Sequence, residues 1–305
     1  MTVETQPLTV GTWNIERFGY DPGRSHHRLP AALDWLLEQT PVPPDILALP
    51  EATHGHEDGQ HAIRLAVNTL APHLRTGWYE PLFSRLPAPG RRNHLHLLLV
   101  NTAKVHPTGW ADPDAPDSGT RHYGFAECEI FGHKVNVCCE HWSGGEGRAE
   151  FDRACSRVSN MGGRRKTLLL GDFNADSGWK KELHHGLDWY AQCEAQDNLD
   201  KLEQKGRLNP ATGRWEIDTR QIDKLRTIFG YRDMGEESDD PTPTTRPTIG
   251  RGLRIDRIWR SRDFPARPVE YAVRQPPREL SDHAYVFGTY RMNLALARTD
   301  AGTSP

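Results

Sequence analysis

The sequence predicts a protein of the α/β or α+β class that folds as one large domain. Short apolar runs that read as strands recur along the 305 residues, and apolar residues at helical spacing lie between them. No segment has the composition of a linker between two domains, and the length suits one domain with a substantial core. We expect the domain to span residues 1–291 and residues 292–305 to form a disordered tail.

The expected elements follow one another in a mixed order. In the first half, apolar strands at residues 8–15, 43–51, 94–101 and 134–142 alternate with amphipathic helices at residues 29–37 and 63–70. The second half has a similar order, with helices at residues 151–158 and 222–229 and strands at residues 166–174, 253–259, 269–273 and 284–290. The stretch from residue 238 to residue 252 is rich in Pro, Thr and Gly and is expected to be a loop.

Composition narrows the class of protein. The mean hydropathy is -0.71, and no stretch reaches the roughly 18 to 20 apolar residues of a membrane span. The first residues lack the pattern of a secretory signal. Five cysteines without a C-x-x-C spacing argue against a disulfide framework and a structural zinc site, so we expect a cytoplasmic protein. A net charge of -3 excludes a bulk polycation, so nucleic-acid binding would need a local patch.

Polar side chains gather where the apolar strands end or begin. Strand ends at one rim of a sheet are where α/β folds assemble active sites. Carboxylates, amides and histidines, without cysteine, suit Mg²⁺ or Mn²⁺ and phosphate chemistry better than zinc. The residues in question are Asn14 and Glu16, Glu51, His141, Asp172 and Asn174, Asp256, and Asp282 and His283.

Five of these segments together resemble the endonuclease/exonuclease/phosphatase superfamily, which has the DNase I-like fold. They are TWNIE at 12–16, the strand ending in Glu51, GDFN at 171–174, IDRI at 255–258 and SDH at 281–283. Each motif is short, but all five occur in the family's order and span nearly the whole chain. The resemblance implies a four-layer sandwich of two mixed sheets packed face to face, with helices on both outer faces.

The resemblance also implies a metal site. Glu51 matches the family's main metal ligand, although a carboxylate at a strand end is often merely solvated. The family usually has Gln before this Glu, and here Pro50 removes that hydrogen-bonding group. Asn14 matches an Asn that supports the metal or the phosphate. Glu16 and Asp282 are further candidate ligands, and a surface charge is an equally good interpretation of Glu16.

The reacting groups follow from the same comparison. Asp172 matches the residue that orients or deprotonates the attacking water, and Asn174 matches one that steadies the phosphoryl oxygens. His283 matches the histidine that contacts the scissile phosphate, with Asp256 fixing its orientation. Such a carboxylate partner favours the imidazolium. His141 is a looser match to a second histidine, a candidate general acid for the leaving oxygen.

Arginines suggest how the substrate would be held. Residues 243–262 contain six arginines and a single acid, Asp256, and guanidinium forks suit phosphodiester backbones. We predict Arg254, Arg251 and Arg148 as phosphate- or substrate-binding residues. The alternative is a solvated loop whose charge is balanced by the four acids between residues 236 and 240.

The leading hypothesis is a Mg²⁺- or Mn²⁺-dependent phosphodiesterase that acts as a nuclease on DNA or RNA. A phosphatase or phosphodiesterase for a small or lipid phosphate is the first alternative. The aromatic-Cys-Asp string of inositol phosphatases is replaced here by GLRID at 252–256, which counts against that subgroup. A catalytically silent binding module is the second alternative, although every candidate residue is present. We expect a monomer without an obligate protein partner and without a membrane association.

Overall fold

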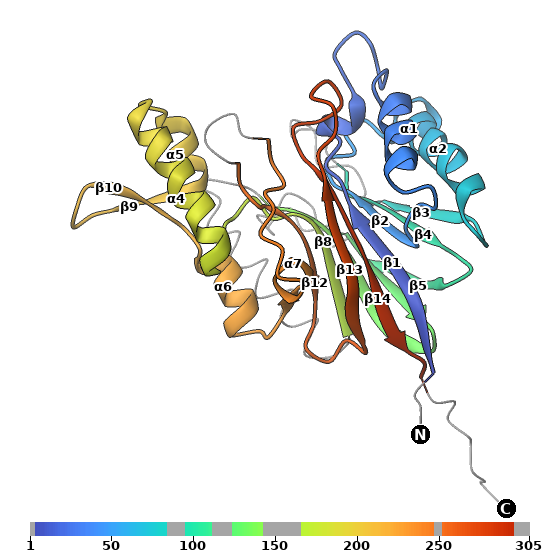
Figure 1. Ribbon diagram of the computed structural model, residues 1–305. Helices are drawn as coiled ribbons and strands as arrows, with labels where there is room; N and C mark the ends of the chain where they lie inside the picture. The colour runs from blue at the N-terminus through green and yellow to red at the C-terminus, as the bar shows by residue number, and fades with distance from the viewer. Residues whose placement is uncertain (1–3, 84–94, 112–123, 143–165, 247–251, 296–305) are drawn as a thin grey trace, which may run out of the picture.

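Two β-sheets stacked face to face form the centre of the molecule (Figure 1). The computed structural model describes residues 4–83, 95–111, 124–142, 166–246 and 252–295. In these ranges each of the two sheets has six strands. The first contains, in spatial order, β13 (Ala266–Arg274), β14 (Tyr285–Asn293), β1 (Thr5–Thr12), β2 (Ile46–Leu49), β4 (Leu97–Asn101) and β3 (Tyr79–Phe83). The second contains β11 (Arg232–Asp233), β12 (Asp256–Arg260), β8 (Lys166–Asp172), β7 (His133–His141), β6 (Gly124–Ile130) and β5 (Val105–Ala111).

Both sheets are mixed. In the first, β1 runs parallel to β2 and antiparallel to β14. In the second, β7 runs parallel to β8, and β12 pairs with the other side of β8 in the antiparallel sense. The parallel pairs place the carboxyl ends of two consecutive strands at the same rim of each sheet.

The alternation of side chains along β8 explains how the layers are held together. Leu168 and Leu170 point into the core between the two sheets, where they join Val10 of β1. Leu169 points the opposite way, into a second core beneath a helix. A strand buried on both faces reads as a continuous apolar run, which is why the sequence KTLLLG predicted it well.

Helices cover the outer face of each sheet. On the first sheet, α1 (Leu29–Gln39) and α2 (Glu57–Leu70) bury residues such as Leu33 and Ile63 against the strands. On the second, α6 (Arg220–Thr227) buries Ile222 and Leu225 against Leu169 and Trp259. The result is the predicted four-layer sandwich (Figure 1).

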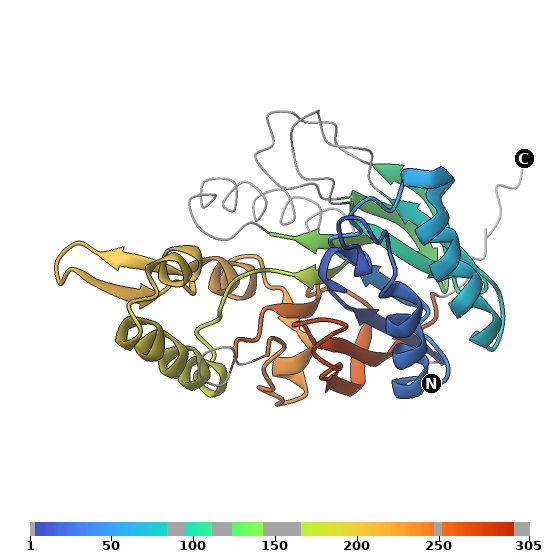
Figure 2. The ribbon, with the colours of Figure 1, turned by 90° about the horizontal axis from the view of Figure 1, so that it is seen from above.

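A segment that we call the arm, residues 180–217, joins neither sheet. It comprises α4 (Lys180–Ala195), α5 (Leu199–Lys205) and a hairpin of β9 (Gly206–Asn209) and β10 (Arg214–Ile217). It projects from the second-sheet side of the sandwich (Figures 1 and 2). A small core attaches it to the segment before β12, with side chains from Trp189, Tyr190, Cys193, Leu202, Leu253 and Ile255.

Most of the expected elements are present, with three differences. The strand expected from residue 253 begins only at Asp256, and the arm, the short α7 (Met234–Glu237) and the strands β3, β5, β6 and β11 were not anticipated. β14 continues to Asn293 and Met292 is fully buried, so the folded domain extends beyond residue 291. The helix expected at residues 151–158 lies outside the described ranges, and so does most of the expected tail, residues 296–305. None of the helices in the described part of the chain has the length and apolar character needed to span a bilayer.

Candidate active site

The register of the second sheet brings three of the predicted residues side by side. Asp172, at the end of β8, is the partner of His141 on one neighbouring strand and of Asp256 on the other. Gly171 permits this arrangement: its φ is +149°, and a Cβ there would lie 1.9 Å from the carbonyl oxygen of Glu140. The close approach of β8 and β7 just before Asp172 therefore requires glycine.

The first sheet supplies the opposite side of the site. Asn14 follows β1, and His283 precedes β14, the antiparallel neighbour of β1. Two hydrogen bonds join these segments: the Trp13 indole donates to the His283 carbonyl at 3.0 Å, and the Ser281 hydroxyl donates to the Asn14 carbonyl at 2.7 Å. The two sheets therefore meet at one rim with their polar strand ends together.

Asp172 is the centre of the cluster. Its Oδ1 accepts the backbone N–H of Asn174 at 2.8 Å, and its Oδ2 accepts the side-chain amide of Asn14 at 3.4 Å. The Nε2 atoms of His141 and His283 lie 3.7 Å and 3.9 Å from Oδ2. Burial alone would raise the pKa of Asp172, but the two histidines, Lys205 and the Asn174 N–H outweigh it and lower the pKa. Asp172 is thus held as a carboxylate.

His283 and Asp256 form a tight pair. The ring Nδ1 lies 2.9 Å and 3.1 Å from the two carboxylate oxygens of Asp256, so Nε2 is directed away from that partner and toward Asp172. Burial lowers the pKa of His283, but the charges of Asp256 and Asp172 overcome this and raise it to about 10. The imidazolium is therefore the stable form at neutral pH.

The site has the oxygen donors that a hard divalent cation needs. Asn14 Oδ1 is buried and accepts no hydrogen bond, so one acceptor is left for another group. Glu51 belongs to the same cluster, because its Oε1 lies 3.5 Å from His141 Nε2, the ring nitrogen that lies 3.7 Å from Asp172 Oδ2. Ligand atoms of Asp172, Asp256 and His283 also lie within 4.8 Å of one another. Carboxylate and amide oxygens in this arrangement fit Mg²⁺ or Mn²⁺.

Two backbone conformations at the site are unusual. Glu51 has φ of 57° and Asn174 has φ of 48°, values that non-glycine residues seldom adopt. Such conformations cluster at functional sites because the surrounding structure must hold them in place. In Asn174 the side chain helps to do so, since its Nδ2 donates to the Trp142 carbonyl at 2.7 Å.

Two of the predicted metal ligands lie at the edge of this cluster. Glu16 belongs to a short 3-10 helix, η1 (Glu16–Gly19); its side chain is half exposed and lies 3.5 Å from Arg28. This matches the surface-charge interpretation. Asp282 is largely exposed, with one oxygen 3.9 Å from His283 Nε2. Of the predicted substrate-binding arginines, Arg148 and Arg251 fall outside the described residues.

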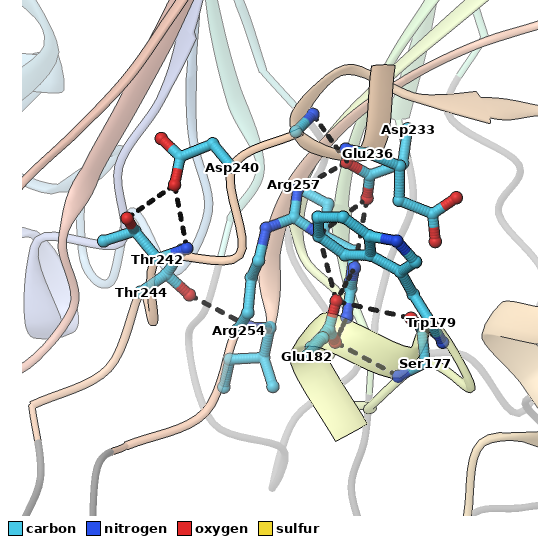
Figure 3. Close-up of polar contacts among 12 residues, drawn as sticks. Ser177, Trp179, Glu182, Asp233, Glu236, Asp240, Thr242, Thr244, Arg254 and Arg257 are labelled. Carbon is cyan, nitrogen blue, oxygen red and sulfur yellow. Dashed lines mark hydrogen bonds and ion pairs between the residues drawn. The ribbon is translucent and has the colours of Figure 1, made fainter. Parts of the chain in front are cut away.

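The prediction for Arg254 is wrong. Its side chain is fully buried, and its guanidinium donates to Glu182 at 3.3 Å and to both oxygens of Asp233. Arg257 shares the same two carboxylates, and Figure 3 shows the four charged groups directed at one another. A guanidinium enclosed by two acids has no free face for a phosphate. The local count of arginines could not reveal this, because the partner acids lie 21 and 72 residues away in sequence.

The structure adds one residue that sequence reasoning missed. Lys205, the last residue of α5, donates a hydrogen bond to Asn174 Oδ1. In the sequence it lies in a charged stretch, KLEQKGR, that has no motif and reads as a solvated helix end. Only the placement of the arm brings its ammonium into the cluster.

Comparison with known proteins agrees with the fold and the motifs. No curated protein sequence matches the chain. The fold is similar to the 3′ phosphatase NExo from Neisseria, bound to product DNA hairpin (19% identity, 92% of this chain and 98% of that one, TM-score 0.59). It is also similar to TDP2 from C. elegans (18% identity, 93% of this chain and 75% of that one, TM-score 0.55). A third similar structure is the human Nocturnin catalytic domain (15% identity, 96% of this chain and 97% of that one, TM-score 0.56). Residues 11–283 match the Endonuclease/Exonuclease/phosphatase family, so the chain is a member of that family.

Proposed function

We propose that this protein is a divalent-metal-dependent phosphodiesterase whose preferred substrate is a nucleic acid. The observation that carries the proposal is the convergence of a carboxylate, Asp172, and an imidazolium, His283, at one rim where Asn14 offers an unpartnered oxygen. Family membership supports hydrolysis of a phosphoester bond. Each residue has a role that its contacts allow.

Asp172 would orient the attacking water and accept its proton. A base must be ionised to act, and the neighbouring cations lower the pKa of this carboxyl. The N–H of Asn174 fixes one carboxylate oxygen, so the other remains directed at the histidines. Asn174 itself would contact a phosphoryl oxygen through the second hydrogen of its amide.

His283 would stabilise the charge that develops on the phosphoryl oxygens. Asp256 occupies Nδ1, so the proton on Nε2 is available to substrate. His141 lies between Asp172 and Glu51 and is the candidate donor of a proton to the leaving oxygen. Glu51, Asn14 and Asp172 would hold Mg²⁺ or Mn²⁺, which when bound supplies positive charge for the phosphate.

A nucleic-acid substrate is favoured over small phosphates by the relatives. NExo was solved with a product DNA hairpin, and its fold and ours superpose over nearly the whole chain. The six arginines of residues 243–262 support a nucleic-acid substrate less than expected, because Arg254 and Arg257 are buried. A phosphatase remains the second candidate, since NExo is itself described as a 3′ phosphatase.

One activity panel tests the proposal. Purified protein with Mg²⁺ or Mn²⁺ is assayed on single- and double-stranded DNA, on RNA, on a 3′-phosphorylated oligonucleotide and on a simple phosphodiester. We expect metal-dependent cleavage of a nucleic acid that EDTA abolishes. Hydrolysis of the simple ester alone would exclude a nuclease, and removal of the 3′-phosphate alone would favour the phosphatase. The monomeric state and the cytoplasmic location stay predictions; light scattering after gel filtration measures the first.

A further inference from the structure

Lys205 is held in the active site by close packing of the arm. Leu202, one helical turn earlier, is buried in the arm's core, which fixes the rotation of α5 about its axis. Gly206 follows directly, and a Cβ at that position would lie 2.7 Å from the Tyr190 ring and 2.9 Å from the Leu202 carbonyl oxygen. The chain therefore leaves α5 tightly against α4, and the long lysine side chain is directed away from the arm.

The Lys205 ammonium completes the hydrogen bonding of Asn174. The amide nitrogen of Asn174 donates to the Trp142 carbonyl, and the amide oxygen accepts from Lys205. A carbonyl accepts only and an ammonium donates only, so these two partners allow a single orientation of the amide. Lys205 therefore adds a second group that favours this orientation, beside the Trp142 carbonyl.

Charge supports the same placement. Burial lowers the pKa of Lys205, and the carboxylates of Asp172, Asp176 and Asp256 oppose that effect. In return Lys205 is one of the groups that lower the pKa of Asp172. A partly buried ammonium is costly unless it is paired, and here the hydrogen bond to Asn174 and the charges of these carboxylates offset that cost.

We propose that Lys205 is a positioning residue of the active site: the arm supplies an ammonium that fixes the amide of Asn174 in the orientation in which it meets the phosphoryl group. This inference rests on the proposed function, because it assigns Lys205 to the same reaction. It makes the arm part of the active site rather than an appendage of the fold.

A double-mutant cycle between Lys205 and Asn174 tests the proposal. Lys205→Met keeps the length of the side chain and removes the charge. With a simple phosphodiester and metal, we expect it to lower kcat about 10- to 100-fold and to change KM less than about threefold. In an Asn174→Ala background the same substitution should lower kcat less than about threefold, because the group that Lys205 acts through is gone. Equal losses in both backgrounds, or no loss in the first, would overturn the proposal.

Two further variants separate positioning from folding. Lys205→Arg keeps a cationic donor and is expected to recover part of kcat, whereas Lys201→Met, on an exposed side chain of the same helix, should leave kcat and KM unchanged. Loss of activity in Lys201→Met would indicate a general effect of the arm's charge and would overturn the specific role.

Thermal unfolding distinguishes this inference from the proposed function. The change in Tm caused by Lys205→Met should differ by a few degrees between the wild-type and Asn174→Ala backgrounds, whether or not the protein hydrolyses anything. Absence of all hydrolysis with preserved coupling would reject the proposed function and retain the contact. Identical Tm changes in both backgrounds would reject the contact itself.

Discussion

Asp172 is placed by its backbone and charged by its surroundings. Strand pairing sets its neighbours, since His141 and Asp256 occupy the partner positions on β7 and β12. The cations around it then determine its ionisation, because burial would otherwise keep it neutral. A single residue type, Asp, serves two purposes on adjacent strands: in the proposed function Asp172 is the base, and Asp256 is the partner of His283.

Loss of either reacting group should abolish turnover without unfolding the protein. We expect Asp172→Asn and His283→Asn each to lower kcat by about a thousandfold or more, because one removes the base and the other the cation at the phosphate. Steady-state kinetics and far-ultraviolet circular dichroism measure the two effects. Glu129→Gln, on an exposed side chain of β6, is the control, and a loss below about tenfold in either variant would contradict the assigned roles.

Glu140 gives a pH-dependent prediction that is independent of catalysis. Burial raises its pKa to about 8, although the Trp142 indole donates to it at 2.9 Å. The folded protein therefore binds a proton that the unfolded chain releases above about pH 4.5. Stability from this group is complete below that pH and is lost as the pH rises to about 8.

Glu140→Gln should remove this loss. We expect the variant to gain stability relative to the wild type as the pH rises from 5 to 8.5, by up to about 4 kcal/mol. Urea unfolding at several pH values measures the difference. A difference that is constant over this range would show that Glu140 is not protonated in the folded protein.

Sequence patterns identified the candidate site residues that lie in motifs, but they did not predict the surroundings of basic residues that lie outside motifs. Asp172, Asp256 and His283 lie in short motifs beside apolar strands, so both their spacing and their surroundings were readable. Lys205 and Arg254 lie in no motif, and what distinguishes them from other basic residues is the set of distant residues that the fold brings into contact with them. Their roles depend on contacts across long stretches of sequence, which local charge counts do not contain.

At the level of elements, the ionic cluster of Figure 3 joins three parts of the fold. Glu182 comes from α4, Asp233 from β11, and the two arginines lie just before and within β12. Asp233 also accepts the backbone N–H groups of Gly235 and Glu236 at the start of α7. The cluster thus holds the base of the arm against the edge of the second sheet.

Breaking this cluster should destabilise the protein and leave substrate binding intact. Arg254→Met leaves Asp233 and Glu182 buried with one guanidinium between them, and we expect a loss of about 3–5 kcal/mol in urea unfolding. Arg232→Met is the matched control, because its side chain is half exposed and its ion pair with Glu237, at 3.7 Å, should contribute at most about 1 kcal/mol. A raised KM in Arg254→Met with unchanged stability would restore its role as a substrate contact.

Strands were predictable where both faces are buried, and less so elsewhere. β8 and β4 read as unbroken apolar runs, whereas β5 contains Pro107 and two polar residues and pairs with β6 at the edge of the sheet as described. The arm was not predicted from the sequence, for a related reason. In α4 the side chains of Trp189, Tyr190 and Cys193 bury into a small local core rather than against a sheet.

At the level of the whole molecule, metal binding should stabilise the fold. The oxygen donors come from both sheets, so an ion held by Asn14, Glu51 and Asp172 would link them. We expect Mg²⁺ or Mn²⁺ to raise Tm, with about 2.7 kcal/mol of stabilisation at a hundredfold excess over Kd, and EDTA to reverse the effect. Differential scanning fluorimetry measures it. Glu51→Gln should weaken the response, whereas Glu129→Gln should not; an equal response in both would place the ion elsewhere.

The pairing of β1 with β14 has a consequence for biosynthesis. These neighbouring strands of the first sheet (Figure 1) come from opposite ends of the described chain. Thr5 lies opposite Asn293, and Asn14 and His283 lie just beyond the other ends of the pair. A growing polypeptide on the ribosome therefore lacks His283 and the partner strand of β1 until β14 has been translated. Contacts of such long sequence separation form late in folding. The candidate site would therefore be completed at one of the last steps of folding.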